Sequence, residues 1–431
     1  MTGEVVRREK SMSGKVQADF LLSDCGELLT MAGGRRGPRL GDDLSRLDII
    51  KNCAVAALDG RIVWVGHDPG GDIELLPGGK EVHAGGRVVT PGLVDAHTHP
   101  VFAGTRELEF ELRALGKTYA EIAAAGGGIV VSVESVRRAS REELIALARP
   151  RLDRMLKFGT TTIEAKSGYG LSLDDELKLL EAIRALNEEH PIDLVPTVLA
   201  GHEFPPEYRN NRDGYVRLIV EEILPAAAQR KLAEFSDVFF EAGVFNREQT
   251  IAVQRRAQDL GLGLKFHADE LSDQGGAALA AEMKAVSADH LEHISSAGIC
   301  AMAAAGVVAV LLPGTAYYLD LKTRPPVREM IRAGVPVALA TDFNPGSCMT
   351  ESMQMVLNLA CVLYKMTPAE AFAAATTNAA WSIRRGDDLG SIEAGQKADL
   401  VIWDADHYRQ IPYHFGVNLA VTVIKKGRVA A

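Results

Sequence analysis

RVVTPGLVDAHTHP, residues 87–100, is a β-branched apolar run that ends in two histidines separated by one residue. Such a run is typical of a buried strand. Because strand side chains alternate between two faces, His97 and His99 point the same way, about 7 Å apart along the strand. Two imidazoles on one face of a strand end can bind one metal ion together. The alternative is a polar strand end with solvated or hydrogen-bonded histidines, and the rest of the chain has to separate the two interpretations.

Seven further apolar runs follow the first one, and helical stretches separate them. The eight runs cover residues 88–97, 160–165, 194–199, 238–241, 263–267, 285–290, 307–312 and 336–341. Continuous hydrophobicity in each run favours parallel strands that are covered on their outside. Eight such strands alternating with helices predict an α/β fold, a (β/α)8 TIM-like barrel. Capping sequences at three helix starts support this alternation: Ser140–Glu143, Ser172–Asp175 and Thr367–Glu370.

The two ends of the chain carry strand signals of a different kind. Residues 54–58 and 61–65 flank an Asp59-Gly60 pair, the favoured two-residue hairpin turn. Near the C-terminus, residues 398–404 and 421–425 are strand-like as well. The sequence therefore predicts a small β-sandwich domain that is built from both termini and interrupted by the barrel. The expected division is an N-terminal extension at 1–17, the β-domain at 18–87 and 386–431, and the barrel at 88–385.

Composition argues against several classes of protein. The chain has 431 residues, and 47 Lys and Arg against 57 Asp and Glu give a formal charge of −10. A nucleic-acid partner calls for a basic face, so this balance argues against one. The five cysteines are odd in number and scattered, which argues against a disulfide framework and fits a reducing compartment. With no signal-peptide core, and with its longest apolar stretch shorter than the ~20 residues of a membrane span, the chain is expected to be soluble and cytoplasmic.

Potential ligands stand at the ends of several predicted strands. In a (β/α)8 barrel the active site lies at the carboxyl ends of the strands. The first strand supplies His97 and His99, the fifth ends at His267, and the eighth is followed by Asp342. Each residue alone is compatible with a strand end or a turn, but together they form a set of three nitrogens and one oxygen with room for water. The sequence therefore predicts a single metal site.

Longer motifs carry a resemblance to a known family. The run PGLVDAHTH at 91–99, the histidine and aspartate strand ends and the flanking β-domain are similar to the metal-dependent amidohydrolase superfamily. Within it, four motifs resemble the imidazolonepropionase family: HPVFAGTR at 99–106, EAKSGYG at 164–170, FHADE at 266–270 and ATDFNPG at 340–346. The resemblance covers about residues 20–430 and leaves out roughly the first seventeen residues.

The resemblance implies a reaction and a cofactor. The family's reaction is the hydrolysis of the cyclic amide of 4-imidazolone-5-propanoate to N-formimidoyl-L-glutamate in histidine degradation. One Zn²⁺, or one Fe, per chain would be held by His97, His99, His267 and Asp342. Such a metal lowers the pKa of a bound water from 15.7 toward about 7, which makes a nucleophile available at neutral pH. The family expectation for assembly is a homodimer.

The same resemblance assigns roles to residues around the metal. Glu270 would take a proton from the water and return it to the leaving nitrogen, which requires a raised pKa. His290 would donate a hydrogen bond to the carbonyl oxygen, and Asp342 belongs to the catalytic set as well as to the ligands. Arg106 would clamp the propanoate carboxylate, with a surface salt bridge as the alternative. The remaining contacts would be Tyr169 and His202 with the substrate, and Asn344, Gly346 and Ser347 with the product.

Three polar residues near these strand ends receive other interpretations. Lys166 is either a carboxylated lysine that bridges a second metal or the partner of a carboxylate. Glu292 and His293 are expected on the helix after the sixth strand, Glu292 exposed to solvent and His293 in a structural role.

Two rival functions share this fold. A single-metal aminohydrolase that deaminates a nucleobase-like ring would use the same ligands and the same Glu270. A neutral nucleobase needs no carboxylate clamp, so Arg106 together with Tyr169 favours the cyclic-amide substrate. A non-catalytic scaffold built on the same barrel is the other rival, and the presence of every ligand argues against it.

Overall fold

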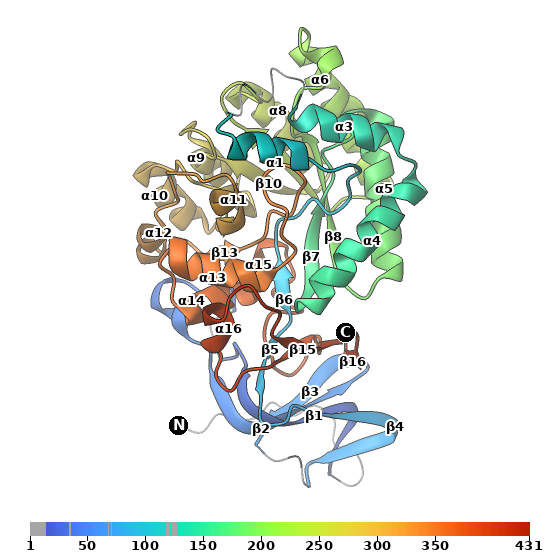
Figure 1. Ribbon diagram of the computed structural model, residues 1–431, viewed down its shortest axis with the longest axis vertical. Helices are drawn as coiled ribbons and strands as arrows, with labels where there is room; N and C mark the ends of the chain where they lie inside the picture. The colour runs from blue at the N-terminus through green and yellow to red at the C-terminus, as the bar shows by residue number, and fades with distance from the viewer. Residues whose placement is uncertain (1–13, 34–35, 68, 70, 118–120, 122–126) are drawn as a thin grey trace.

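Figure 1 shows a large helix-covered barrel above a smaller β-sheet that carries the C-terminus. This computed structural model describes residues 14–33, 36–67, 69, 71–117, 121 and 127–431. Residues 1–13 of the predicted N-terminal extension lie outside this description, whereas Val16 and Gln17 already belong to the first strand. Within the described residues, no helix is both long and apolar enough to cross a membrane.

The barrel is an eight-stranded parallel sheet. Its strands are β6 (Leu93–Asp95), β7 (Thr160–Lys166), β8 (Asp193–Gly201), β9 (Phe235–Phe240), β10 (Gly263–Ala268), β11 (Ser287–His290), β12 (Val308–Leu311) and β13 (Val337–Leu339). Each strand pairs with the next in chain order. A parallel bridge between Thr98 and Phe343 links the first and last members and closes the ring. All eight predicted strands are present, and the predicted barrel is confirmed.

The second sheet is mixed and draws on both ends of the chain. Its order is β16-β15-β14-β5-β1-β2-β3, with β4 paired to β1. The predicted hairpin is confirmed, because Asp59 and Gly60 both adopt positive φ between β2 and β3. The strands are β1 (Val16–Leu29), β2 (Ile49–Leu58), β3 (Arg61–Gly66), β4 (Ile73–His83), β5 (Val88–Pro91), β14 (Leu400–Trp403), β15 (Ala420–Lys425) and β16 (Arg428–Val429).

The first predicted strand divides between the two sheets. Val88–Pro91 pairs with β1 and β14 in the mixed sheet, and Leu93 begins the barrel. Gly92 is the crossing point, where a Cβ would lie 2.2 Å from the Thr161 hydroxyl oxygen. Only glycine allows the chain to pass this close to β7, so the 87–100 stretch joins the two sheets as well as presenting the histidines.

Helices surround the barrel. Ser140 and Thr367 form the capping boxes expected of them, and the Ser172 side chain accepts from the Asp175 amide. The α-helices are α1 (Glu107–Ala114), α3 (Ile129–Arg138), α4 (Arg141–Lys157), α5 (Leu173–Glu189), α6 (Arg212–Leu218), α7 (Leu224–Gln229), α8 (Arg247–Asp259), α9 (Gly276–Glu282), α10 (Ser296–Ala305), α11 (Pro313–Tyr318), α12 (Val327–Ala333), α13 (Met353–Leu363), α14 (Pro368–Ala374), α15 (Thr377–Ser382) and α16 (Gln410–Tyr413). Short 3-10 turns, Gly41–Ser45 and Pro206–Tyr208, and a π-turn, Ile219–Ile223, complete the elements.

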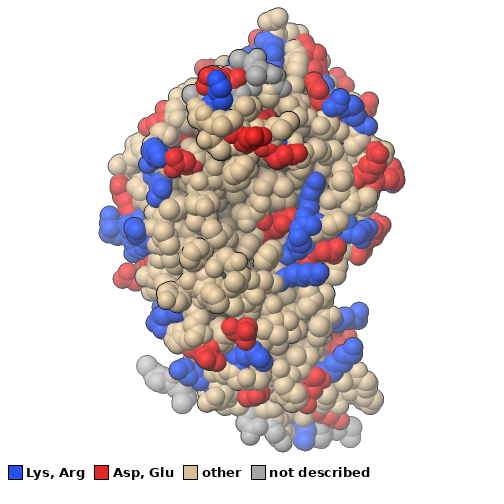
Figure 2. Space-filling model, in the orientation of Figure 1, with Lys and Arg blue, Asp and Glu red and all other residues tan. Residues whose placement is uncertain are grey.

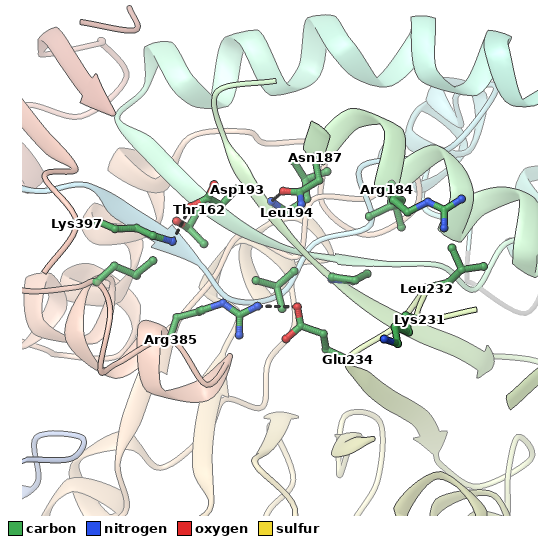
Figure 3. Close-up of a pocket in the computed structure, with 14 residues that line it drawn as sticks. Thr162, Arg184, Asn187, Asp193, Leu194, Lys231, Leu232, Glu234, Arg385 and Lys397 are labelled. Atoms are coloured by element: carbon green, nitrogen blue, oxygen red, sulfur yellow. Dashed lines mark hydrogen bonds and ion pairs between the residues drawn. The ribbon is translucent and has the colours of Figure 1, made fainter. Parts of the chain in front are cut away.

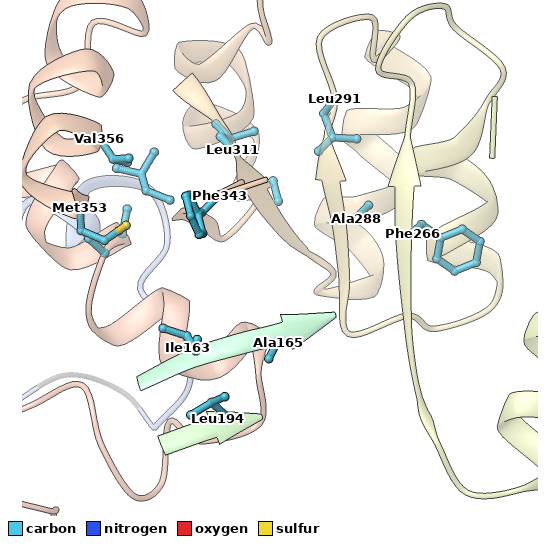
Figure 4. Packing of buried hydrophobic residues seen from close by; sticks show 14 of the residues in the cluster. Ile163, Ala165, Leu194, Phe266, Ala288, Leu291, Leu311, Phe343, Met353 and Val356 are labelled. Carbon is cyan, nitrogen blue, oxygen red and sulfur yellow. The ribbon is translucent and has the colours of Figure 1, made fainter. Parts of the chain in front are cut away.

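Apolar side chains on the outside of the strands pack against these helices. Figure 4 shows Ile163 and Ala165 of β7 among these packed side chains, and Met353 of α13 close to Phe343. Strand alternation directs the neighbouring residues of β7, Glu164 and Lys166, into the barrel interior. On β7 the helix-facing side is therefore apolar and the interior side is charged, whereas β12 and β13 also carry apolar residues on their other face, among them Val308, Val310 and Ala338.

Candidate active site

A cavity of about 750 Å³ opens at the carboxyl ends of the barrel strands. His97 is fully buried beneath it. Most of the residues predicted from the sequence line this cavity: His99, Arg106, Tyr169, His202, His267, Glu270, His290, Asp342, Asn344, Gly346 and Ser347. Strands and loops that are up to 250 residues apart in the chain thus meet at one place, as the barrel prediction requires.

Three of the four predicted ligands, His97, His99 and Asp342, place ligand atoms within 4.8 Å of one another, and His267 stands beside His97. Asp342 Oδ1 lies 3.5 Å from His97 Nε2 and 3.6 Å from His99 Nε2. The His267 ring stands 4.6 Å from the His97 ring, centroid to centroid. Within the described part of the chain, His97 Nε2 is buried with no hydrogen-bond partner. A buried nitrogen without a partner is costly, and a metal ion that accepts its lone pair would remove that cost.

The protonation states of these groups suit metal binding. Burial, together with neighbouring cationic groups, lowers the pKa of both His97 and His99 well below the ordinary value. Neutral imidazole is the form that binds metals. Burial raises the pKa of Asp342 to about 6, although the Thr315 hydroxyl donates to its Oδ2 at 2.6 Å. The donor set of three imidazoles and one carboxylate therefore fits a divalent metal.

Left-handed backbone conformations occur beside the cavity, two of them at the cavity-lining residues His290 and Asp342. Asp269, His290, Leu291 and Asp342 all have φ between 50° and 76°. Residues with a Cβ pay a cost for this conformation, and such strain gathers at functional sites. At Asp269 it is supported by three backbone amides, those of Gln274, Gly276 and Ala277, which donate to its carboxylate.

Glu270 and His290 face each other across the cavity. His290 Nε2 lies 3.5 Å from Glu270 Oε2. Burial and the nearby carboxylates Glu292 and Asp342 raise the pKa of Glu270 well above its ordinary value. A raised pKa lets one carboxyl group both accept and return a proton near neutral pH.

The expectations for Glu292 and His293 are wrong in their placement. Glu292 is only 2% exposed, and both its carboxylate oxygens lack a partner among the described residues. Helix α10 begins at Ser296, so both residues lie in the preceding loop. The left-handed turn at His290 and Leu291 directs Glu292 inward, 4.0 Å from His290 Nδ1. Burial raises the pKa of Glu292 to about 8.

Arg106 is part of a buried ion pair rather than a surface one. Its Nε and Nη2 donate to Glu109 at 2.9 and 2.6 Å, and both side chains are 8% exposed. The Gly128 amide also donates to Glu109. A Cβ on Gly346 would lie 2.1 Å from Arg106 Nη1, so the absence of a side chain there makes room for the guanidinium.

His202 stacks on the predicted ligand His99. The two rings are 5.3 Å apart and inclined by 15°. His202 Nδ1 donates to the Gly168 carbonyl over 3.0 Å, and burial lowers the pKa of the ring to about 3. The neutral ring therefore has Nε2 available as an acceptor. The Tyr169 ring lies 5.5 Å from that of His202.

The loop after β13 is shaped by Asn344. Its amide nitrogen donates to the Asp342 carbonyl at 2.7 Å and to Ser347 Oγ at 2.8 Å. Its amide oxygen accepts from the backbone amides of Gly346 and Ser347. The Asn344 side chain is thus engaged within the loop, which holds Gly346 and Ser347 at the cavity wall.

Buried carboxylates behind the histidines were missed at the level of sequence. Asp289 Oδ2 accepts from His97 Nδ1 at 2.6 Å, and Asp237 Oδ2 lies 3.0 Å from His267 Nδ1. Lys166 contacts both, and the carboxylates Asp237 and Glu164 raise its pKa although burial opposes them. Alternation of polar residues with a period of two along each strand is the signal that could have revealed this inward-facing set.

Comparison with known proteins shows which family the chain resembles. A profile described as the amidohydrolase family matches residues 128–431. An imidazolonepropionase of Symbiobacterium thermophilum is 50% identical over 414 residues, covering 95% of this chain and 97% of the relative. One of Bacillus velezensis is 48% identical over 412 residues, covering 96% and 97%.

Solved structures share the fold at low identity. A Klebsiella pneumoniae 5-methylcytosine deaminase liganded with 5-fluorocytosine superposes with a TM-score of 0.71 at 18% identity, covering 95% of this chain and 97% of its own. A Xanthomonas campestris adenosine deaminase with bound zinc gives 0.67 at 20% identity, covering 96% and 93%. At these identities the likeness establishes the architecture only.

Proposed function

The chain belongs to the imidazolonepropionases of the amidohydrolase family, and from this we propose that its barrel mouth hydrolyses 4-imidazolone-5-propanoate to N-formimidoyl-L-glutamate, a step of histidine degradation. The observation that carries the proposal is the relatives' 48–50% identity over 95–96% of the chain. Deamination of a nucleobase-like ring is the alternative, and it has only structural likeness at 18–20% identity behind it.

We infer that one metal ion per chain, Zn²⁺ or Fe, binds at His97, His99, His267 and Asp342. Support comes from the convergence of these donors and from the partnerless His97 Nε2. A metal bound there would acidify water and so supply a nucleophile at neutral pH.

Glu270 and His290 act on either side of the scissile bond. Glu270 takes one proton from the water as its oxygen adds to the ring carbonyl carbon. The same carboxyl group returns that proton to the ring nitrogen as the carbon–nitrogen bond breaks, so no proton is gained or lost. His290, neutral because burial and the nearby His267 lower its pKa, donates one N–H to the carbonyl oxygen as that oxygen gains charge.

The remaining cavity residues bind and orient the substrate. Arg106 is held on its Nε and Nη2 side by Glu109, and its Nη1 side, next to Gly346, receives the propanoate carboxylate. His202 Nε2 accepts a hydrogen bond from a ring N–H, and Tyr169 covers the ring beside it. Asn344, Gly346 and Ser347 form the wall that the product contacts.

A charge-free face supports the homodimer. In Figure 2 a wide uncharged surface lies over α13 and α16. The Asn358 amide donates to the Pro412 carbonyl at 2.8 Å, which ties the two helices together. Large apolar side chains stand out from this region, with Val362 53%, Tyr413 84% and Phe415 65% exposed. Exposed apolar side chains on an uncharged surface are typical of a subunit interface, and a second copy of this chain would cover them.

Two further proposals concern the division into domains and the location of the protein. We propose a division into a barrel at 88–385 and a β-domain at 18–87 and 386–431, after an extension at 1–17, except that Val16–Gln17 and Val88–Pro91 belong with the β-domain because they lie in β1 and β5. A cytoplasmic location fits the five free cysteines, Cys25, Cys53, Cys300, Cys348 and Cys361.

The deciding experiment measures metal content and turnover on one sample. Mass spectrometry counts metal per chain while 4-imidazolone-5-propanoate is offered as substrate. About one metal per chain with appearance of formimidoylglutamate supports the proposal. One metal without turnover overturns the substrate and leaves cyclic amides and aminated rings to be tested. A chain that stays metal-free after reconstitution overturns the ligand assignment.

A further inference from the structure

Beneath the four proposed ligands, the barrel interior holds a cluster of fully buried charges. Lys166 ends β7, and Lys265 stands on β10. Three carboxylates surround them, from β7, β9 and β11: Glu164, Asp237 and Asp289. Burying five ionisable groups costs solvation free energy, which a protein recovers only where each group is paired.

The Lys166 ammonium sits at the centre of this cluster. Its Nζ lies 2.7 Å from Asp237 Oδ2, 2.9 Å from Glu164 Oε1 and 3.6 Å from Asp289 Oδ2. The contacts span three strands of the barrel. Lys166 is therefore the one described group that touches a carboxylate from each of these strands.

Two of these oxygens are the ones that hold metal-site histidines. Asp289 Oδ2 accepts from His97 Nδ1 at 2.6 Å. Asp237 Oδ2 lies 3.0 Å from His267 Nδ1, an ion-pair distance without hydrogen-bond geometry, so its negative charge favours a proton on that nitrogen. A carboxylate at Nδ1 fixes the tautomer that carries its proton there, and this leaves Nε2 as the lone-pair donor toward a metal.

Each aspartate is also fixed through its second oxygen. Asp237 Oδ1 accepts from the His267 backbone amide at 3.1 Å, and Asp289 Oδ1 accepts from Ser287 Oγ at 2.7 Å. One oxygen of each carboxylate is thus held on the barrel wall, while the other is shared between a histidine and Lys166. A shift of the lysine would move both shared oxygens at once.

We propose that Lys166 is a positioning residue for the metal centre: its ammonium holds Asp237 and Asp289 so that His267 and His97 present Nε2 together. The proposal rests on the ligand assignment made above. It also argues against the alternative of a carboxylated, metal-bridging lysine, because a carbamate at Nζ would place a negative group among three carboxylates that lie within 3.6 Å.

The chain contains a matched control for this proposal. Lys425, 4% exposed, also bridges two aspartates, with Nζ 2.6 Å from Asp399 Oδ2 and 3.0 Å from Asp193 Oδ2. Neither aspartate touches a histidine of the metal site, since this cluster joins the mixed sheet to the opening residue of β8. If the loss of a buried lysine affects only the fold, replacing either Lys166 or Lys425 should show that effect. An effect on the metal site is expected only when Lys166 is replaced.

The experiment compares Lys166→Met with Lys425→Met in the metal-loaded protein. Zinc affinity is measured by competition with a chelator, and the visible spectrum is recorded after replacement by Co²⁺. Lys166→Met is expected to bind zinc about 10- to 100-fold more weakly and to change the Co²⁺ spectrum, because two ligands lose their orientation. Lys425→Met is expected to leave both readouts at their wild-type values.

A second variant tests the proposal in case Lys166→Met does not fold. Lys166→Met combined with Glu164→Gln removes one charge of each sign, and the amide oxygen at position 164 can accept the hydrogen bond that Lys265 donates to Glu164 in the wild type. The same loss of zinc affinity is expected in this double variant. Wild-type affinity and spectrum in either Lys166 variant would overturn the proposal, as would a second metal equivalent in the wild type that disappears with the lysine. A wild-type protein that binds no metal would instead overturn the ligand assignment on which the proposal depends.

Discussion

Lys166 and Lys425 are two buried lysines with nearly the same chemistry at opposite ends of the barrel. Each ammonium bridges two aspartates at hydrogen-bond or ion-pair distance. At the mouth, the bridged aspartates continue into His97 and His267. Among the described residues, the side chains of the two aspartates at the base accept hydrogen bonds only from lysines and a backbone amide. The same arrangement there joins the barrel to the mixed sheet.

The base cluster satisfies its polar atoms. Asp193 receives Lys425, Lys397 and Lys426, and Asp399 receives Lys425 and the Lys426 amide. Figure 3 shows Asp193 beside Lys397 on the wall of a cavity of about 330 Å³ at this end. All four carboxylate oxygens have a donor, which leaves no group here that calls for a ligand.

The mouth differs because its polar atoms are incompletely paired. Within the described residues, His97 Nε2 and both oxygens of Glu292 are buried without a partner. A folded chain keeps such costly groups where a ligand or a reaction uses them. Buried ionisable groups alone therefore do not mark the site of this protein, whereas buried ionisable groups without a hydrogen-bond partner do.

The largest expected effect comes from breaking the mouth directly. Asp342→Asn removes the anionic oxygen that faces both His97 and His99, so metal content and turnover should both fall to background. His267→Ala should do the same. Mass-spectrometric metal counts alongside the activity assay check this, and a fully active Asp342→Asn protein would remove the residue from the ligand set.

Glu270→Gln separates chemistry from metal binding. The variant keeps the shape of the side chain but cannot carry the proton, so turnover should fall by about 10²- to 10⁴-fold with metal content unchanged. Asp320→Asn is the matched control, because Asp320 lines the same cavity but pairs with Lys322 at the exposed rim. Near-normal turnover of Glu270→Gln would exclude it from proton transfer.

Lys425→Met should break the base without touching the mouth. Removing one partner of a buried ion pair typically costs about 3–5 kcal/mol of unfolding free energy. Denaturant titration should show that loss, while kcat and KM of the folded fraction stay at wild-type values. A change in KM would mean that the two ends of the barrel are coupled, and the contrast drawn between them would fail.

Much of this contrast was predictable at the mouth and little of it at the base. The barrel strands are visible as separate apolar runs, and His97, His99, His267 and Asp342 stand at their ends. The base cluster unites Asp193, Asp399 and Lys425, which no local pattern connects, because only tertiary packing brings them together.

Arg106 and Glu292 show why the mouth was only partly predictable. A guanidinium seven residues after His99 suggests a clamp, but the sequence does not show that Glu109 already holds one of its edges. The burial of Glu292 depends on left-handed φ values at His290 and Leu291. Neither residue type prefers that conformation, so the pattern predicts a helix surface there instead.

Arg106→Ala should affect binding more than chemistry. A hydrogen bond to a charged group contributes about 1.5–3 kcal/mol, so KM should rise roughly 10- to 100-fold with kcat little changed. Arg113→Ala is the control, since Arg113 lines the same cavity but lies over the Tyr318 ring, 5.2 Å from its centroid. Equal effects from both variants would assign the carboxylate to the general positive charge of the mouth rather than to Arg106.

The last expected effect is one of sign, and it compares the carboxylates of the two ends. Burial alone would raise the pKa of Asp193, but Lys425, Lys426 and Lys397 hold it well below its ordinary value. This carboxylate therefore stabilises the fold above about pH 4, and that contribution is lost as the pH falls toward its folded pKa. Burial raises the pKa of Glu292 to about 8. Ionisation of this carboxyl group therefore destabilises the folded chain, whereas ionisation of Asp193 stabilises it.

For Glu292, the folded chain retains a proton that the unfolded chain gives up, so stability falls as the pH rises from about 4 toward 8. Glu292→Gln removes this dependence, and the gain in stability over the wild type should grow across the same interval and then level off. Urea midpoints at several pH values measure it. Parallel wild-type and variant curves would show that Glu292 has a partner in solution. The unpaired buried groups of the mouth would then be limited to the proposed metal ligands.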